Sequence, residues 1–236
     1  GQYHDLVETK PLIEDVDFTR KKMSARAIGK KAILVNVSDI AAMGGKPLYA
    51  LITLGIPPKL PEKWILECFR GIQLIADQCA IDIVGGDLTR MPSKHIMLSL
   101  TLIGEVKKQN YKLRSGAQVG DVVVVTGPLG LASQAHYQKT PVLRLKEAAF
   151  LAGESAVTSM IDISDGLLQD FEHILQASRV GGIIYADQIP RGKKASLTHA
   201  LSGGEDFELL STISAKQWPS LKKKKKKNNF SLHPIG

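Results

Sequence analysis

The sequence has few cysteines, few aromatic residues and no long apolar run, and these scarcities exclude several classes of protein. Only two of the 236 residues are cysteine and 6% are aromatic, so a disulfide scaffold is excluded. No apolar stretch approaches the roughly 18 residues that a membrane-spanning helix needs. The first residues have neither the basic nor the apolar region of a signal peptide. We therefore expect a cytoplasmic protein with no membrane partner.

The two cysteines, Cys68 and Cys79, lie in a segment that we expect to form one helix. At about 1.5 Å per residue, their Cα atoms would be separated by roughly 16 Å. A disulfide needs Cα atoms within about 7 Å of each other. We therefore expect two buried structural thiols.

Signatures of the common nucleotide and metal sites are also missing. The sequence contains no GxxxxGK[ST] phosphate loop, no GxGxxG between a strand and a helix, and no HRD or DFG string. Its six histidines show no HExxH or paired zinc spacing. A Gly-x-Ser-x-Gly elbow around Ser164 fails because residue 162 is Asp.

The net charge of +8 comes from one short segment. The run of lysines at residues 222–227 supplies six of the 31 basic residues, and without it the balance is 25 against 23, or +2. No aromatic residue interrupts the run and no nucleic-acid module surrounds it, so no nucleic-acid partner is expected. We interpret the run as a solvated, mobile loop, with a phosphate- or acid-binding tail as the alternative.

Hydrophobic patterning predicts an α+β protein with two lobes of similar order, residues 1–106 and residues 107–236. The first lobe should hold helices at 27–42 and 62–79 and strands at 48–54, 81–84 and 95–106. The polar stretch at 107–112 is the candidate boundary. The second lobe should hold helices starting near 131 and at 143–155 and 167–178, with strands at 122–125, at 182–186 and after 206.

Carboxylates recur beside small residues at the ends of apolar segments. These turns contain Asp39, Asp87, the pair Asp162 and Asp165, and Glu205. Glycine lets backbone N–H groups approach a phosphate, whereas carboxylates reach a phosphate only through a cation such as Mg²⁺. Each turn alone is ordinary turn or helix-cap chemistry. Asp162 is less ordinary, because an unpaired carboxylate inside the apolar string at 160–163 would be costly without a cation. Together the turns favour phosphoryl transfer over acid–base hydrolysis.

Four motifs resemble, in order and spacing, those of thiamine-monophosphate kinases, a family related to aminoimidazole-ribonucleotide synthetase. They are Asn-Val-Ser-Asp-Ile-Ala-Ala-Met-Gly-Gly at 36–45, Gly-Gly-Asp at 85–87, Ile-Ser-Asp-Gly-Leu at 163–167 and Gly-Gly-Glu-Asp at 203–206. The resemblance covers nearly the whole chain. It implies an N-terminal domain (1–106) that dimerises and binds ATP and Mg²⁺, a C-terminal α+β domain (107–236), and transfer of a phosphoryl group from ATP to thiamine monophosphate.

The resemblance also implies roles for individual residues. Arg114 would stabilise charge on the phosphates, with no catalytic base. The implied Mg²⁺ ligands, for several ions, are Thr9, Asp39, Asp87, Asp162 and Asp165. The implied ATP contacts are Phe69, Gly86, Asp87, Arg114 and Ser164, and the implied thiamine-phosphate contacts are Asp17 and Glu205.

The chain departs from the family pattern at several places, three of them near its N-terminus. No Gly-Asp-Asp turn precedes Lys10, Lys10 stands where the family has an aspartate, and Asp17 stands where it has a histidine. Three hypotheses therefore stay open. The leading one is the kinase, and the others are an ATP-dependent synthetase of the same superfamily and a binding protein with an impaired active site.

Overall fold

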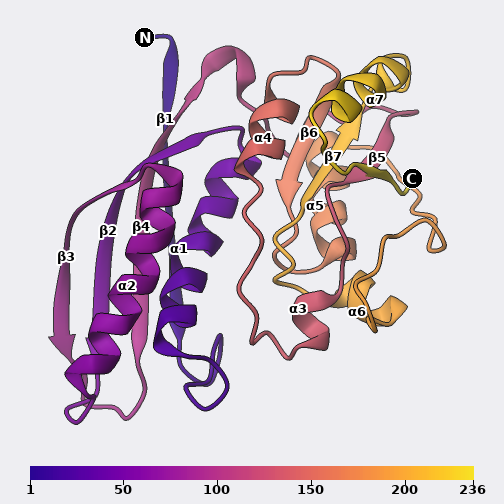
Figure 1. Cartoon of the computed structure of the whole chain (residues 1–236). Helices are drawn as coiled ribbons and strands as arrows, with labels where there is room; N and C mark the ends of the chain where they lie inside the picture. Colours follow the sequence, from indigo (N-terminus) through magenta and orange to yellow (C-terminus); the bar gives the residue numbers. More distant parts are fainter.

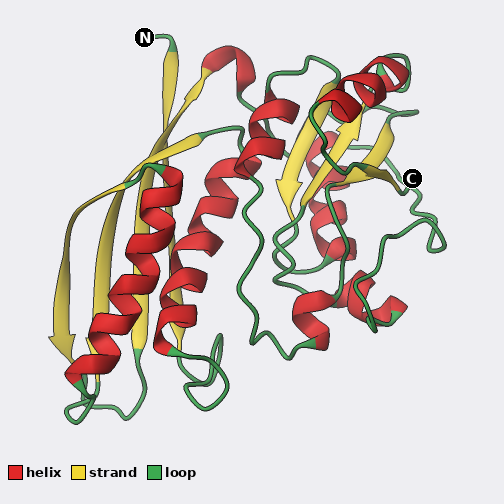
Figure 2. Cartoon of the chain, in the orientation of Figure 1, coloured by secondary structure: helices red, strands yellow, loops and turns green.

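The computed structural model describes the backbone of residues 1–236 and every side chain except those of residues 226 and 227. Two four-stranded sheets lie in separate halves of the molecule, with helices packed on them (Figures 1 and 2). The first sheet and two long helices form the N-terminal half, and the second sheet with the shorter helices forms the C-terminal half. The α+β class predicted from the sequence is confirmed.

The N-terminal sheet has the strand order β1-β4-β2-β3. Its strands are β1 (Tyr3–Ile13), β2 (Lys46–Ile56), β3 (Asp82–Arg90) and β4 (Met97–Lys107). β2 and β3 are parallel and are connected by a helix, whereas the other neighbouring pairs are antiparallel. The sequence pattern predicts β2, β3 and β4 but not β1.

Two helices cover one face of this sheet (Figure 1). They are α1 (Ala25–Ala42) and α2 (Glu62–Cys79), and a one-turn helix, η1 (Lys108–Asn110), follows β4. A Cβ atom on Gly29 of α1 would overlap the carbonyl oxygen of Cys68, and one on Gly71 of α2 would overlap that of Arg26. The two helices therefore meet backbone against backbone, which only glycine permits. α1 is buried on nearly all sides because it lies between α2, the sheet and the C-terminal half.

The opposite face of the N-terminal sheet is open. Side chains alternate along each strand, so Leu98, Leu100 and Leu102 of β4 face the helices while their neighbours face outward. Large apolar side chains on the open face are exposed, among them Val7 at 69%, Tyr49 at 43% and Leu51 at 40%. A contiguous apolar face of this kind is typical of an interaction surface.

The C-terminal sheet has the strand order β6-β7-β5-β8, with every neighbouring pair antiparallel. Its strands are β5 (Val122–Val125), β6 (Val157–Asp162), β7 (Leu209–Ile213) and β8 (His233–Pro234). The helices of this half are α3 (Leu131–Gln134), α4 (Leu145–Ala152), α5 (Leu167–Ser178), α6 (Leu197–Ser202) and α7 (Trp218–Lys227). α1 also contacts β6 and α4, so the two halves share a packed junction (Figure 1).

Two sequence-based predictions in this half are wrong. Residues 182–186 form no strand, because the segment makes only one ladder-like hydrogen bond, from the Tyr185 N–H to the Ile235 carbonyl at 2.7 Å, and Ile183 is exposed. The lysine run belongs to α7 rather than to a loop, which agrees with the good helix propensity of lysine. Lys224 is anchored by Glu154 at 2.8 Å, and the side chains of residues 226 and 227 lie outside those described.

Both cysteines are free and buried, as predicted. Burial raises the pKa of the Cys68 thiol to about 12 and that of Cys79 to about 11, so neither is a reactive thiolate. Among the described helices, none combines the length and the apolar character that crossing a membrane requires.

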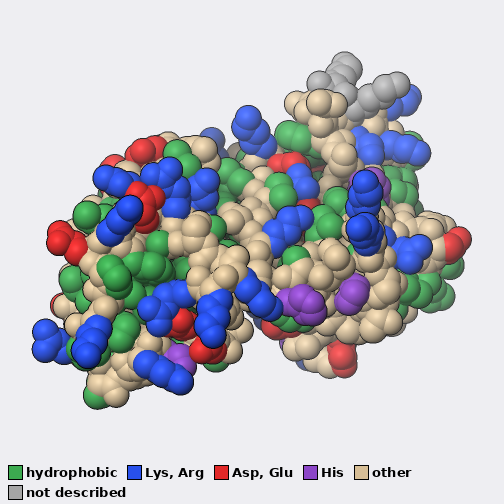
Figure 3. Space-filling view, turned by 60° about the horizontal axis from the view of Figure 1, so that its bottom comes forward, with side chains coloured by type: hydrophobic (Ala, Val, Ile, Leu, Met, Phe, Trp, Pro, Cys, Tyr) green, Lys and Arg blue, Asp and Glu red, His purple; other side chains and the backbone are tan. Residues whose placement is uncertain are grey.

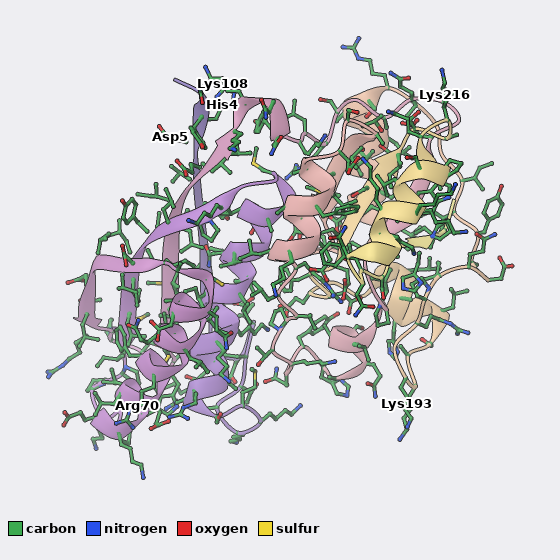
Figure 4. The ribbon with its side chains drawn as sticks, turned by 45° about the horizontal axis from the view of Figure 1, so that its top comes forward. His4, Asp5, Arg70, Lys108, Lys193 and Lys216 are labelled. Atoms are coloured by element: carbon green, nitrogen blue, oxygen red, sulfur yellow. The ribbon has the colours of Figure 1, made fainter. Side chains whose placement is uncertain are left out.

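The charged ends of both halves point outward. Figure 4 shows His4, Asp5 and Lys108 at one end of the N-terminal half and Arg70, on α2, toward the other end. In the same view Lys193 and Lys216 lie at opposite ends of the C-terminal half. These six charged or titratable side chains therefore lie at the periphery of the molecule.

Candidate active site

Carboxylates from both halves meet at the junction. Glu8 comes from β1, Asp39 from α1 and Asp162 from the end of β6, and we call these three residues the acidic cluster. The Ser38 hydroxyl donates a hydrogen bond of 2.6 Å to Asp162 Oδ2 across the junction. The sequence-based expectation that Asp39 and Asp162 share one site agrees with this contact.

Burial of the acidic cluster disfavours its negative charge. Burial, reinforced by the nearby Asp162, raises the pKa of Asp39 to about 7. The pKa of Asp162 is raised by burial, although the hydrogen bond from Ser38 and the charge of Lys10 oppose the shift. The pKa of Glu8 is also raised by burial, against the charge of Lys10. Such a cluster is a site that a cation would stabilise.

One lysine already lies among these carboxylates. Lys10 Nζ is 3.5 Å from Asp39 Oδ2 and 5.5 Å from the centre of the Phe207 ring. Burial lowers the pKa of Lys10, but Asp39 and Asp162 outweigh burial and leave the pKa raised. Arg114 adds a second positive charge that acts on Asp162.

Two cavities flank the acidic cluster. The first, about 370 Å³, lies at the junction and is lined by the acidic cluster together with Arg114, Lys112 and Met43 among others. The second, about 160 Å³, is lined by Lys10, Asp17, Lys31, Ser164, Asp165 and Glu205 among others. Figure 3 shows basic side chains near the junction of the two halves on the face seen there. The first cavity falls within the usual size range of small-molecule sites.

The loop from Asp162 to Gly166 is held by a buried carboxylate on α5. One oxygen of Asp170 accepts the N–H groups of Ser164, Asp165 and Gly166 at 3.0 to 3.1 Å. Burial raises the pKa of Asp170, although these N–H groups oppose the shift. Asp170 therefore fixes the turn that presents Ser164 and Asp165 to the second cavity.

The donor set fits Mg²⁺. In the part of the chain whose side chains are described, the only set of three or more His, Cys, Asp or Glu residues whose ligand atoms all lie within 4.8 Å of one another is Asp165, Asp170 and His173. Since Asp170 already holds the loop, that set is better explained as a structural contact. The carboxylates of the acidic cluster are more widely spaced than those of that set, which suits an ion that keeps several waters and takes one or two carboxylates besides phosphate oxygens.

Glu205 lies at the second cavity and is fixed by a buried lysine from the other half. Lys31 Nζ is 2.6 Å from Glu205 Oε2, and it donates to the carbonyls of Asp17 at 2.6 Å and Tyr137 at 2.9 Å. Burial raises the pKa of Glu205, whereas Lys31 lowers it. The Asp17 carboxylate accepts the N–H of Ile13 at 2.7 Å, so it caps its own loop while lining the cavity.

Four of the predicted residues lie elsewhere in this chain. The Thr9 hydroxyl is on the open face of the sheet, where it contacts Thr101 Oγ1 at 3.0 Å. Gly86 and Asp87 are on β3, three strands from β1, or about 14 Å at the usual strand spacing. Phe69 is half-exposed on α2 and lines neither cavity. Within one chain, these residues do not join the acidic cluster.

Sequence reasoning missed Glu8, Lys31 and Asp170. Glu8 would have required recognition of β1, where it shares a face with Lys10. Lys31 stands in an otherwise apolar helix segment, and Asp170 lies four residues after Gly166, in the first turn of a helix. The detectable signal in both cases was a charged residue on a face that the pattern predicts to be buried.

Comparison with known proteins identifies the family to which this fold belongs. Residues 1–106 match the family model "AIR synthase related protein, N-terminal domain". The chain resembles the thiamine-monophosphate kinase of Bacillus subtilis (strain 168), with 32% identity over 98% of this chain and 79% of that protein. It also resembles the crystal structure of thiamine-monophosphate kinase from Stenotrophomonas maltophilia K279a, with a TM-score of 0.88 and 31% identity over 100% of this chain and 82% of that chain. The structure of AaThiL complexed with AMPPCP and TMP gives a TM-score of 0.86 and 29% identity over 100% and 81% of the two chains.

The chain is therefore an AIR-synthase-related protein, with an α+β fold of two halves and with carboxylates that meet between them. The predicted resemblance is confirmed at the level of the family as well. The chain belongs to the thiamine-monophosphate kinase family.

Proposed function

We propose that this chain transfers a phosphoryl group from ATP to thiamine monophosphate, giving ADP and thiamine diphosphate. The observation that carries the proposal is the meeting of Asp39 and Asp162 from the two halves, beside a cavity that contains Glu205. Relatives of the same family carry the name of this kinase, and one related structure, AaThiL, is complexed with AMPPCP and TMP.

The chemistry needs little from side chains beyond binding and alignment. The acceptor is a phosphate oxygen, which is already largely ionised at pH 7, so no general base is required. The bond between the γ-phosphorus and the oxygen shared with ADP breaks as a bond to the acceptor phosphate oxygen forms. Catalysis then depends on holding two anionic groups in line and neutralising their charge.

We assign roles to the residues as follows. The first cavity takes the nucleotide phosphates, with Arg114 as the charge stabiliser. Ser164 lines the second cavity and would contact ATP from that side. Glu205 and Asp17 face thiamine monophosphate in the second cavity. Asp39, Asp162 and Asp165 would hold Mg²⁺, which supplies positive charge to the phosphates when it is bound.

A homodimer would account for most of the residues that lie away from the cluster. We propose that two copies pair through the open face of the N-terminal sheet, which carries Val7, Tyr49 and Leu51. Asp87 pairs with Thr53 on that face, and Thr9 lies on it too, so Mg²⁺ and ATP contacts by Thr9, Gly86 and Asp87 would be made at the interface. Phe69 lies on α2, on the covered side of the sheet, so this interface does not account for its predicted ATP contact. Light scattering should then give the mass of a dimer, and Val7→Lys should give that of a monomer.

The two domains and their location complete the proposal. We place the domain boundary between residues 106 and 107, supported by the end of β4 at Lys107 and by the match of the N-terminal family model. A cytoplasmic location agrees with two buried, unpaired thiols, since oxidised cysteines are typical of secreted proteins.

The test is turnover by the purified chain with ATP, Mg²⁺ and thiamine monophosphate. We expect equal amounts of ADP and thiamine diphosphate, and Asp162→Asn should lower kcat by about 10²-fold or more. Asp187→Asn, in an exposed loop far along the chain, serves as the matched control and should keep full activity. Binding of thiamine monophosphate in calorimetry without turnover would instead indicate a binding protein. Turnover only with formylglycinamidine ribonucleotide would indicate a synthetase.

A further inference from the structure

Lys10 lies where the two cavities approach each other. On β1 its side chain shares a face with that of Glu8, because residues i and i+2 of a strand point the same way. Glu8 lines the first cavity and Lys10 lines the second. The carboxylate that pairs with Lys10, Asp39, also lines the first cavity. The ammonium group therefore stands at the boundary that a transferred group must cross.

The ammonium group is held in place but is not saturated. Asp39 is its only hydrogen-bond acceptor among the residues whose side chains are described, and the distance of 3.5 Å is long. The Phe207 ring supports it from one side at 5.5 Å. An ammonium group has three N–H donors, and the Lys10 side chain is 35% exposed. A further anionic oxygen can thus reach it without displacing any other partner.

The charges around Lys10 indicate which chemical group would supply this additional oxygen. The acidic cluster would repel a phosphate, and Lys10 and Arg114 are the positive groups that act on it. Lysine is a common ligand of phosphate in proteins, where it acts as a point charge. Because Lys10 lies within the acidic cluster, it supplies positive charge at a place where a divalent cation would otherwise be needed.

We propose that the Lys10 ammonium group binds the phosphoryl group as it passes from the first cavity to the second, in place of one divalent cation. This proposal rests on the proposed function. Lys10 keeps its protons throughout, since the only bonds that change are the P–O bond broken to ADP and the P–O bond formed to the acceptor phosphate. Its role is to touch an oxygen of the transferred group and to neutralise that oxygen's charge.

The first test measures binding without turnover and without metal. Calorimetry with inorganic tripolyphosphate in EDTA should detect binding to the wild-type chain, and Lys10→Met should weaken that binding by about tenfold or more. Lys107→Met, at an exposed lysine on β4 of the same sheet, should leave the binding unchanged. Equal tripolyphosphate affinity of the wild type and Lys10→Met would overturn the proposal, whatever the activity of the chain.

The second test separates a catalytic lysine from a structural one. Lys10→Met should lower kcat by about 10²-fold, while Lys10→Arg should recover at least part of the loss. Lys10→Asp should bind one more Mn²⁺ ion per chain than the wild type, counted by electron paramagnetic resonance with a non-hydrolysable ATP analogue. Circular dichroism confirms that each variant is folded. If Lys10→Asp exceeded the wild type in kcat, Lys10 would be an impairment of the site and the proposal would be wrong. If the wild type itself gave no thiamine diphosphate, the proposed function would fail, and the tripolyphosphate result would still decide the role of Lys10.

Discussion

The buried lysine on α1 offers the sharpest test of how the two halves are held together. The Lys31 side chain is 1% exposed, and its Nζ contacts Glu205 of the C-terminal half and the carbonyls of Asp17 and Tyr137. Lys31→Met keeps nearly the same length and removes the charge together with all three interactions. Glu205 would then remain at the second cavity without its cation, and two carbonyl groups would lose a donor.

The cost follows from the burial of the pair. Removing one partner of a buried ion pair typically costs about 3–5 kcal/mol, because the other charge is left uncompensated. Burial already raises the pKa of Glu205 with Lys31 present, so loss of Lys31 would raise it further. Protonation of Glu205 would relieve the unpaired charge, and the cost should therefore be smaller at pH 5 than at pH 8.

The two tryptophans allow each half to be followed separately. Trp64 lies on α2 and Trp218 on α7, so Trp218→Phe and Trp64→Phe leave one fluorescent reporter in the N-terminal and C-terminal half, respectively. In the Lys31 wild-type background, both reporters should unfold together in urea. With Lys31→Met, we expect the free energy of unfolding to fall by about 3–5 kcal/mol and the two transitions to separate.

The adjacent lysine provides the control. Lys30 is on the same helix but only half-buried, so Lys30→Met should change stability by about 0.5 kcal/mol or less. A double-mutant cycle of Lys31→Met with Glu205→Gln should give a coupling energy of about 1 kcal/mol or more. Equal stability of Lys31→Met and Lys30→Met, with coincident transitions, would refute the reasoning.

Four further predictions concern single residues of the helix contact, the acidic cluster and the loop that Asp170 holds. Gly29→Ala should destabilise the chain by about 1–3 kcal/mol or more in thermal unfolding, because its Cβ would overlap a backbone oxygen of α2, whereas Gly181→Ala, which meets open space, should not. In the folded, metal-free chain the pKa of Asp39 is about 7, above its ordinary value of 3.8. Between pH 4 and pH 7 the folded state therefore binds more protons than the unfolded state, so the free energy of unfolding should fall as pH rises from about 4 to 7. By the same competition, calorimetric Mg²⁺ affinity should rise with pH up to about 7, and Asp39→Asn should weaken that dependence and leave the part due to Asp162 and Glu8, whose pKa values are also raised. Asp170→Ala should cost about 2–4 kcal/mol, since three backbone N–H groups lose their acceptor, and a melting temperature equal to that of the wild type would contradict this.

Much of the fold could be predicted because its pattern is local. α2 has a clear amphipathic period and begins directly after Pro61, and α5 follows the Gly166 turn with a similar period. β1 escaped prediction for a functional reason. Its helix-facing positions are Leu6, Glu8, Lys10 and Leu12, so two charged residues interrupt the apolar alternation that marks a half-buried strand. A strand that lines a polar site loses the signal by which strands are recognised.

The site was predictable only where local motifs contain its residues. Asp39 and Asp162 each lie in a recognisable turn or helix string, and the Ser38–Asp162 hydrogen bond brings them together. The partners of Lys31 are 14, 106 and 174 positions away in sequence, so no local pattern could reveal them. The position of Asp87 follows from the order of the strands in the sheet and from which face of the sheet is left open. Neither of these could be predicted from a single sequence.

The charge balance of the junction explains why such an acidic site can accept phosphates. If fully ionised, Glu8, Asp39 and Asp162 carry three negative charges, and Lys10 and Arg114 together carry two positive charges. Because the pKa of Asp39 is about 7, its carboxyl group is about half protonated at neutral pH, and the group of five is then close to neutral without any metal. A divalent cation entering this site would displace the remaining proton and make the junction positive overall, which would add to the affinity for a polyphosphate that Lys10 and Arg114 already provide. The lysine run on α7 raises the net charge, but none of Lys222 to Lys225 is among the charges named as shifting the pKa values of Glu8, Asp39 and Asp162. Affinity for phosphates should therefore follow Lys10 and Arg114 rather than the overall charge of +8.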